Sequence, residues 1–332
     1  MHRARHDIVG LGNAIIDVIA PCDDDFLATH GLRKGMMRLI DEATAEKLYG
    51  AMGQTTIVSG GSAANTVIGA AKLGCRAAFI GKVKADPLGE IFAHDIRAAN
   101  VSFSAAPAAT GPASGRCLIL VTPDGQRTMN TYLGACQYLG EDDVDDALIA
   151  GAGICYLEGY LWDPPAAKSA FLKAASIAHA AGGRVALSLS DAFCVDRSRE
   201  EFLALVGDRR VDILFANESE LHALYQTADF ETAVAQLREA DILAVVTRSE
   251  KGALVVRRDE THAVKAFPVE KVVDTTGAGD LFAAGFLAGL AKDRDLVDCA
   301  RLGALAASEI IQHYGARPQT DLLALAAENG LA

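Results

Sequence analysis

The second half of the chain alternates short β-branched runs with helical segments, and few folds accommodate that order. The runs lie at 153–157, 184–190, 211–216 and 243–247. Such alternation is typical of right-handed βαβ units, which build a mainly parallel sheet covered by helices on both faces. We therefore predict an α/β fold of three layers, with ligands bound at the carboxyl ends of the strands.

Polar or aromatic residues follow each of these runs. Tyr160, Phe193 and Asn217 come after the first three, and Thr247 ends the fourth. Because the carboxyl ends of parallel strands share one edge of a sheet, we expect these residues to lie near one site. Asn217 and Glu220 also open a helix, so the alternative for this pair is a capping box with surface acids.

The first half of the chain begins with a run at 8–19, which we predict to be one buried strand interrupted by Asp17. Since a carboxylate is costly to bury alone, Asp17 either ends the strand in water or accepts hydrogen bonds from two neighbouring hydroxyls of a sugar. Gly60 and Gly61 then lead into a helix of small residues, and paired glycines permit close approach of a ligand. Asn65, one turn into that helix, offers a donor and an acceptor.

A β-hairpin interrupts the alternation. Its predicted strands, 114–122 and 127–132, flank a Pro-Asp-Gly-Gln turn, and Arg127 directly follows that turn.

Residues 274–290 read Asp-Thr-Thr-Gly-Ala-Gly-Asp followed by an apolar run. Gly277 and Gly279 permit a close turn that aims N–H groups outward, and the following helix places its positive end there. This predicts an anion site made by the backbone of Gly277, Ala278 and Gly279. Asp280 is either an ordinary acid in the first helical turn or a general base beside a bound phosphate, acting on the hydroxyl to be phosphorylated.

Composition excludes several other classes of protein. The net charge of −12, from 31 basic and 43 acidic residues, disfavours a long nucleic acid as partner. Seven scattered cysteines without a C-x-x-C indicate a reducing, cytoplasmic setting. No uninterrupted apolar stretch approaches the ~18–20 residues that span a bilayer, and no G-x-x-x-x-G-K-[ST] loop occurs. Gly10-Leu-Gly12 lacks the third glycine of a dinucleotide fingerprint.

Two of these stretches resemble signatures of a single family. Residues 274–280 and the helix after them match the second signature of the PfkB, or ribokinase-like, carbohydrate and nucleoside kinases, and residues 60–65 resemble the first. The resemblance implies a ribokinase-like three-layer fold in a single α/β domain over 1–332. It also implies a small β-sheet lid from segments about 14–40 and 112–134, and a kinase that uses ATP and Mg²⁺.

The resemblance also implies roles for individual residues. Asp280 would be the general base, the Gly277–Gly279 backbone would be the anion hole, and Arg127 would approach the transferring phosphate; an exposed lid arginine is the alternative. On the substrate side it implies Asp17, Gly60, Gly61, Asn65, Leu133, Tyr160 and Phe193.

On the nucleotide side the resemblance implies Asn217, Glu220, Thr247 and Gly252, together with Gly277 and Gly279. Ser249 departs from the family pattern T-x-G-x-x-G, because it replaces the middle glycine. Mg²⁺ is implied near Asn217 and Glu220, held through water, and K⁺ could bind at Asp274 and Thr276.

Within the family, residues 124–135 and 158–165 resemble the bacterial adenosine kinases, which implies phosphorylation of the 5′-hydroxyl of adenosine. Tyr160, Trp162 and Phe193 could stack on a purine or could be core aromatics. A PfkB-type kinase for ribose, fructose or 2-keto-3-deoxygluconate stays open as an alternative, as does a non-catalytic nucleoside-binding protein. The expected partners are a nucleoside or sugar and ATP, with no nucleic acid polymer and no membrane, in a monomer or homodimer.

Overall fold

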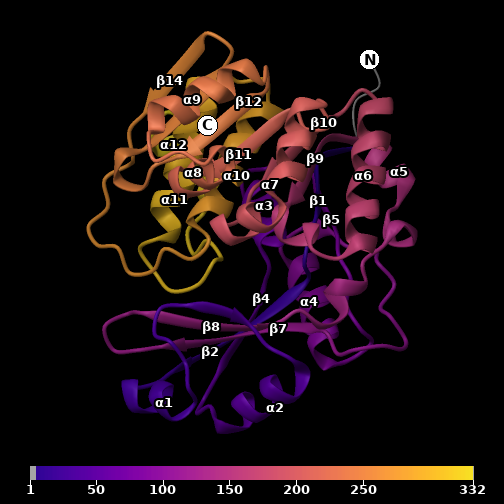
Figure 1. The fold of residues 1–332 in the computed structure, drawn as a ribbon, viewed down its shortest axis with the longest axis vertical. Coiled ribbons are helices and arrows are strands. Elements are labelled where there is room, and N and C mark those ends of the chain that lie inside the picture. Colours follow the sequence, from indigo (N-terminus) through magenta and orange to yellow (C-terminus); the bar gives the residue numbers. More distant parts are fainter. Residues whose placement is uncertain (1–4, 332) are drawn as a thin grey trace.

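The computed structural model describes residues 5–331 and contains one large and one small sheet (Figure 1). The strands of the large sheet, in spatial order, are β14 (Glu260–Val264), β13 (Ala253–Arg257), β12 (Leu243–Thr247), β11 (Ile213–Asn217), β10 (Arg184–Ser188), β9 (Ala152–Glu158), β1 (His6–Leu11), β5 (Ala77–Ile80) and β6 (Val101–Ser102). In this spatial order, all neighbouring strands from β12 across to β6 pair in parallel, whereas β13 and β14 are antiparallel at one edge. The prediction of a mainly parallel sheet is confirmed.

Helices cover both faces of this sheet, which completes the three layers. One buried cluster joins the sheet to α3 (Ser62–Lys72), α10 (Ala278–Ala291) and α11 (Leu296–Ile310). A second cluster joins the other face to α5 (Asp146–Ala150), α6 (Pro165–Ala180), α7 (Ala192–Gly207), α8 (Glu218–Tyr225) and α9 (Phe230–Glu239). The helix α4 (Pro87–Ala98) follows β5, and α12 (Leu322–Glu328) ends the fold. No helix within residues 5–331 is long and apolar enough to cross a membrane.

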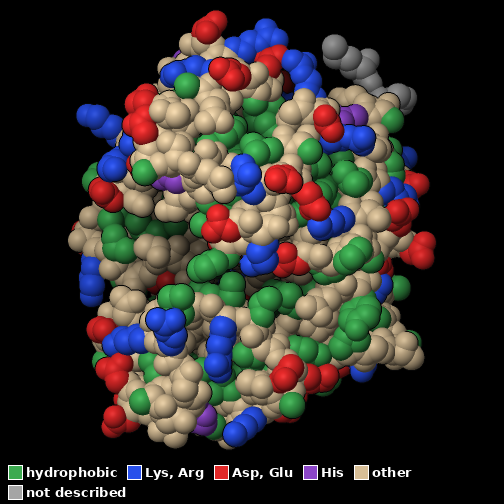
Figure 2. Space-filling view, viewed as in Figure 1, with side chains coloured by type: hydrophobic (Ala, Val, Ile, Leu, Met, Phe, Trp, Pro, Cys, Tyr) green, Lys and Arg blue, Asp and Glu red, His purple; other side chains and the backbone are tan. Residues whose placement is uncertain are grey.

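The small sheet lies below the large one in Figure 1, beside α1 (Asp24–Thr29) and α2 (Glu42–Ala51). Its strand order is β3 (Met37–Leu39), β8 (Arg127–Tyr132), β7 (Gly115–Val121), β2 (Ile15–Pro21) and β4 (Thr56–Gly60). The predicted hairpin is present, since β7 and β8 pair antiparallel across the turn. Strand β4 also belongs to this sheet, outside the segments that the resemblance implied for a lid. The surface is hollowed between the two sheets (Figure 2).

The prediction of one strand over 8–19 is wrong. Strand β1 ends at Leu11, and β2 begins at Ile15 in the other sheet. Gly12 follows the end of β1 at a crowded position, where an added Cβ would lie 2.5 Å from Oε2 of Glu158 and 2.6 Å from Cβ of Ala63. The chain crosses between the sheets here, so Asp17 lies in the small sheet.

Candidate active site

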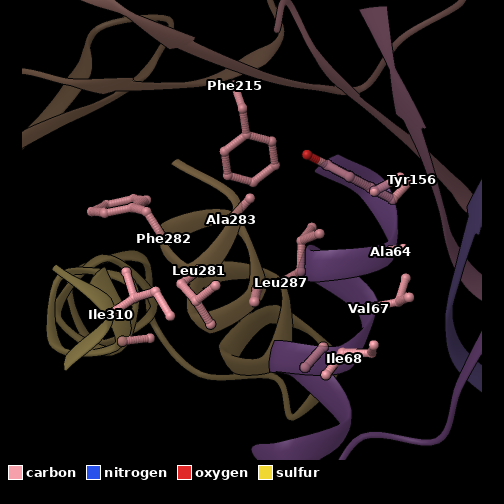
Figure 3. Packing of buried hydrophobic residues seen from close by; sticks show 14 of the residues in the cluster. Ala64, Val67, Ile68, Tyr156, Phe215, Leu281, Phe282, Ala283, Leu287 and Ile310 are labelled. Atoms are coloured by element: carbon pink, nitrogen blue, oxygen red, sulfur yellow. The ribbon is translucent and has the colours of Figure 1, made fainter. Parts of the chain in front are cut away.

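Two helices begin side by side at the junction of the sheets. Gly61 precedes α3 with φ +96°, and Gly277 precedes α10 with φ +79°. The helices pack closely because a Cβ at Gly69 would lie 2.7 Å from Cβ of Ala284, and Figure 3 shows their apolar side chains in contact with one another. The motifs at 60–65 and 274–280, far apart in sequence, are therefore neighbours in space.

Asp280 spans the gap between these helix starts. Its Oδ1 accepts a hydrogen bond from Ser62 Oγ at 2.7 Å, and its Oδ2 accepts one from Asn65 Nδ2 at 2.8 Å. Burial raises the pKa of Asp280 against the lowering effect of these two hydrogen bonds. Nothing in the motif itself revealed Ser62 as a partner. A fixed carboxylate with a raised pKa at the start of a helix has the chemistry that a general base needs. Within the turn before it, the Ala278 N–H donates to the Thr275 carbonyl oxygen at 3.2 Å, so this N–H is already used in the structure.

Asn65 has a second, unused polar atom. Its Oδ1 is buried and has no hydrogen-bond partner within the described part of the chain. Because a buried acceptor without a partner is costly, this oxygen is suited to accept from a ligand hydroxyl.

Asp17 faces the same site from the small sheet. A Cβ added at Gly60 would lie 2.5 Å from Oδ2 of Asp17, so only glycine leaves room for this carboxylate. Burial raises the pKa of Asp17 to about 6, Arg317 and Arg127 lower it, and the Asp280 charge raises it. Asp17 sits inside β2, with neighbours on both sides, so the alternative of a strand-end acid in water is wrong.

Arg127 connects the small sheet to the glycine-rich loop. Its side chain is buried, pairs with Asp274 and donates from Nη1 to Thr276 Oγ1 at 3.1 Å. Asp274 also accepts from the N–H groups of Thr276 and Gly315, each at 3.0 Å. The alternative of an exposed lid arginine is wrong. The guanidinium of Arg127 thus places a positive charge at Asp274, the carboxylate at which the resemblance implied K⁺.

Glu158 is a further site residue that sequence reasoning did not identify. It is fully buried at the end of β9 and accepts from the Asn13 N–H at 2.7 Å, Asn13 Nδ2 at 2.6 Å and the Ala63 N–H at 2.7 Å. Burial raises its pKa to about 7, although these hydrogen bonds lower it. Glu158 thus ties the start of α3 to the strand crossing.

We expect Glu158→Gln to lower the free energy of unfolding by about 2 kcal/mol, because a glutamine amide must turn a donor toward one of the three N–H groups. Chemical denaturation measures this change. Glu46→Gln is the matched control, since Glu46 is mostly exposed in its pair with Arg116, and exposed pairs contribute about 0–1 kcal/mol. Equal losses in the two variants would contradict the role of Glu158.

The predicted nucleotide-side residues lie on neighbouring strands. Asn217 ends β11 opposite Thr247, which ends β12. Asn217 and Glu220 form a reciprocal capping box at the start of α8: Asn217 Oδ1 accepts from the Glu220 N–H at 2.8 Å, and Glu220 accepts from the Asn217 N–H at 2.9 Å and its Nδ2 at 2.6 Å. Burial raises the pKa of Glu220 to about 7. The capping-box alternative is present in the structure.

The hydrogen bonds of Asn217 and Glu220 limit how these two residues can bind Mg²⁺. Both oxygens of Glu220 and the Asn217 oxygen already accept hydrogen bonds, and residues 5–331 contain no cluster of three or more His, Cys, Asp or Glu side chains that could hold a metal. The residues fit an ion held through water, since Mg²⁺ usually keeps several waters and binds substrate phosphates.

Gly252 and Ser249 show how the loop after β12 tolerates its departure from the family pattern. Ser249 adopts φ +52°, and Gly252 has φ +87° with its would-be Cβ 2.0 Å from the Val264 carbonyl oxygen. We expect Gly252→Ala to destabilise the protein by about 3 kcal/mol through backbone strain and this clash. Ser249→Gly should stay within about 1 kcal/mol, since relief of the left-handed conformation opposes added chain entropy. Thermal melts of both variants test this contrast.

The aromatic residues proposed to stack on a base differ in placement. Trp162 is buried against Phe171, with ring centroids 4.8 Å apart, so Trp162 is a core aromatic residue, which was the alternative to stacking on a base. Tyr160 is half-buried and donates from its N–H to Ser190 Oγ at 3.3 Å, whereas Phe193 is 64% exposed at the start of α7. Leu133 is partly buried in the cluster that includes the small sheet. Tyr160 and Phe193 are both available to a ligand at the carboxyl edge of the large sheet.

Arg317, in the loop between α11 and α12, is another residue that sequence reasoning missed. Its Nη2 donates to Ser59 Oγ at 3.1 Å, while its Nη1 is buried without a partner among the described residues. Burial lowers the pKa of Arg317 to about 10, and the charges of Asp17, Asp280 and Asp95 raise it.

A carboxylate fixed at the start of a helix, after a glycine-rich turn and near a second carboxylate of the small sheet, is the arrangement expected of an enzyme that transfers a phosphoryl group to a hydroxyl. The pfkB family of carbohydrate kinases matches residues 7–322. The structure of adenosine kinase from Sinorhizobium meliloti is 52% identical with a TM-score of 0.93, over 98% of this chain and 100% of that one.

Two further similar proteins are also described as kinases. The structure of a probable sugar kinase protein from Rhizobium etli is 50% identical with a TM-score of 0.95, over 99% of this chain and 100% of that one. The adenosine kinase of Saccharomyces cerevisiae is 28% identical, over 93% of this chain and 95% of that protein. The chain belongs to the pfkB family of carbohydrate kinases and is an ATP-dependent kinase.

Proposed function

We propose that this kinase phosphorylates the 5′-hydroxyl of adenosine to give AMP. The observation that carries the chemistry is the Asp280 carboxylate, fixed by Ser62 and Asn65 in the first turn of α10. The choice of adenosine is supported by the relative from Sinorhizobium meliloti, which is 52% identical over nearly the whole of both chains.

In this proposal Asp17 accepts hydrogen bonds from the two ribose hydroxyls, and the free Oδ1 of Asn65 accepts one from the ribose. Gly60 and Gly61 let the sugar approach the backbone, and Tyr160, Phe193 and Leu133 line the side of the base. The small sheet acts as a lid that excludes water from the activated phosphate.

Asp280 then accepts the proton of the 5′-hydroxyl as that oxygen attacks the γ-phosphorus and the bond to the oxygen of ADP breaks. The N–H groups of Gly277, Ala278 and Gly279 stabilise the charge on the transferring group. Arg127 donates a hydrogen bond to Thr276, the residue before Gly277, and so lies near the transferring group. Asn217, Glu220, Thr247 and Gly252 hold the nucleotide side. Asn217 and Glu220 would hold Mg²⁺ through water, where the ion would neutralise phosphate charge.

The alternative within the family is a sugar kinase. It is supported by the 50% identity of this chain to the probable sugar kinase protein from Rhizobium etli. Steady-state kcat/KM across adenosine, inosine, guanosine, ribose, fructose and 2-keto-3-deoxygluconate separates the two. Preference for adenosine supports the proposal, whereas preference for a free sugar would keep Asp280 as the base and overturn the base pocket.

Three further points belong to the proposal. All seven cysteines are free, which supports a cytoplasmic location. K⁺ at Asp274 and Thr276 stays a prediction, which comparison of turnover in KCl and in choline chloride would test. A monomer or homodimer also stays a prediction.

A further inference from the structure

The loop that carries Arg317 contacts the glycine-rich loop directly. The Gly315 N–H donates to Asp274 at 3.0 Å, and a Cβ added at Gly277 would lie 2.8 Å from Cβ of Ala316. Two successive residues of the C-terminal loop are thereby fixed against the anion site. Arg317 is the next residue, so these two contacts also fix the position of its backbone.

The segment 59–65 brings Arg317 together with both site carboxylates. Arg317 binds its first residue, Ser59. Asp17 lies against its second residue, and Asp280 accepts hydrogen bonds from its fourth and seventh residues. One short stretch of backbone therefore fixes one positive and two negative groups relative to each other.

The charges around this segment are unbalanced. Asp95 interacts electrostatically with Arg317, and Glu158 and Glu220 interact with Asp280. The neutral groups nearby are Tyr156 and Tyr160, which interact with Asp280, and Cys117, which interacts with Asp17. Arg127 is the other cation near Asp17, and it is paired with Asp274. Arg317 forms no close ion pair with any carboxylate of residues 5–331, so its charge acts on Asp17, Asp280 and Asp95 together.

We propose that Arg317 is a positioning residue for phosphoryl transfer, which holds both Asp17 and Asp280 in the ionised form from the C-terminal loop. This inference rests on the proposed function, because Asp17 must accept from the ribose and Asp280 must accept a proton. Without Arg317, two carboxylates in one desolvated site would repel each other and one would take up a proton. The raised pKa of Asp17, about 6, already places the loss of ionisation close to neutral pH.

The test is the pH dependence of kcat/KM for adenosine, which reports the groups of the free enzyme. We expect wild-type kcat/KM to fall as the pH drops through about 6, following Asp17. Arg317→Gln should move this acid limb upward by up to about one pH unit, because the charge of Arg317 lowers the pKa of Asp17 and an opposite charge in direct contact would shift a carboxyl pKa by about 1–3 units. Arg317→Lys keeps the charge and should keep the wild-type limb.

Arg116→Gln is the matched control. Arg116 is a buried arginine of the small sheet that pairs with Glu46 and lies next to Cys117, which shares the face of Asp17. Arg116 therefore points to the opposite face, and its removal should leave the acid limb unchanged.

Three results would overturn the inference: an unchanged acid limb in Arg317→Gln, a shift in Arg317→Lys as large as that expected for Arg317→Gln, or the same shift in Ser59→Ala. The last would show that the hydrogen bond to Ser59 matters and the charge does not. The lysine and Ser59 variants decide the matter even where Arg317→Gln fails to fold. Absence of transfer by the wild type would instead contradict the proposed function.

Discussion

Asp280→Asn should lower kcat by about 10³-fold, within the ~10²–10⁴-fold that general base catalysis contributes. The amide keeps the size of the side chain and one of its two hydrogen bonds, but it cannot accept the proton of the 5′-hydroxyl. Stopped-time assays of ADP formation with saturating adenosine and Mg-ATP measure the effect.

Stability separates this loss from misfolding. Burial raises the pKa of Asp280, so ionisation of the folded protein costs free energy above the ordinary pKa of an aspartate. Removing the charge relieves that cost while one hydrogen bond from Ser62 or Asn65 is lost. We therefore expect a nearly unchanged Tm at pH 8. Near-normal turnover in a folded Asp280→Asn variant would remove Asp280 from the mechanism.

Gly279→Ala should reduce kcat by about 10²-fold, because the added methyl group would hold a phosphate away from the backbone and weaken its contact with one donor of the anion site. Gly279 lies in the first turn of α10, and a Cβ added there meets no protein atom within 4 Å. The methyl group would therefore disturb only a phosphate lying against the backbone. Alanine is also the better helix former, by about 1 kcal/mol in a helix interior, so stability should hold or rise.

Gly277→Ala is the matched variant with the opposite result for stability. Gly277 has φ +79°, and its added Cβ would lie 2.8 Å from Cβ of Ala316. We expect a loss of about 2 kcal/mol in the free energy of unfolding, from the strained backbone and the close contact. Denaturant titrations and kinase assays on both variants test the pair. Full activity of Gly279→Ala would place the phosphate elsewhere.

The parts of the fold that could be predicted are those with a local signal. The runs at 184–190 and 243–247 have the β-branched composition of buried strands, and the Pro-Asp-Gly turn marks the hairpin of β7 and β8. The run at 8–19 misled us, because it has the composition of one strand. At its break the chain contacts Glu158, more than a hundred residues away in sequence, and such a contact leaves no local signal.

The candidate site divides in the same way. Asp280 and the glycines before it stand out because a turn, an acid and an apolar helix adjoin in the sequence. Ser62, Glu158 and Arg317 carry no local signal, since each acts through a partner on a distant segment: Asp280, the start of α3, and Ser59. The packing of α3 beside α10 and β9 brings Ser62 and Glu158 to their partners, and the contact of the loop after α11 with β4 brings Arg317 to Ser59.

Identification of the product is the most direct test of the proposed function. Purified wild-type protein with Mg-ATP and adenosine, followed by ³¹P NMR, should form AMP and ADP in equal amounts, with the new phosphate on the 5′-oxygen. Asp280→Asn should form both about 10³-fold more slowly. ADP with inorganic phosphate and no AMP, or phosphate transferred only to a free sugar, would contradict an adenosine kinase.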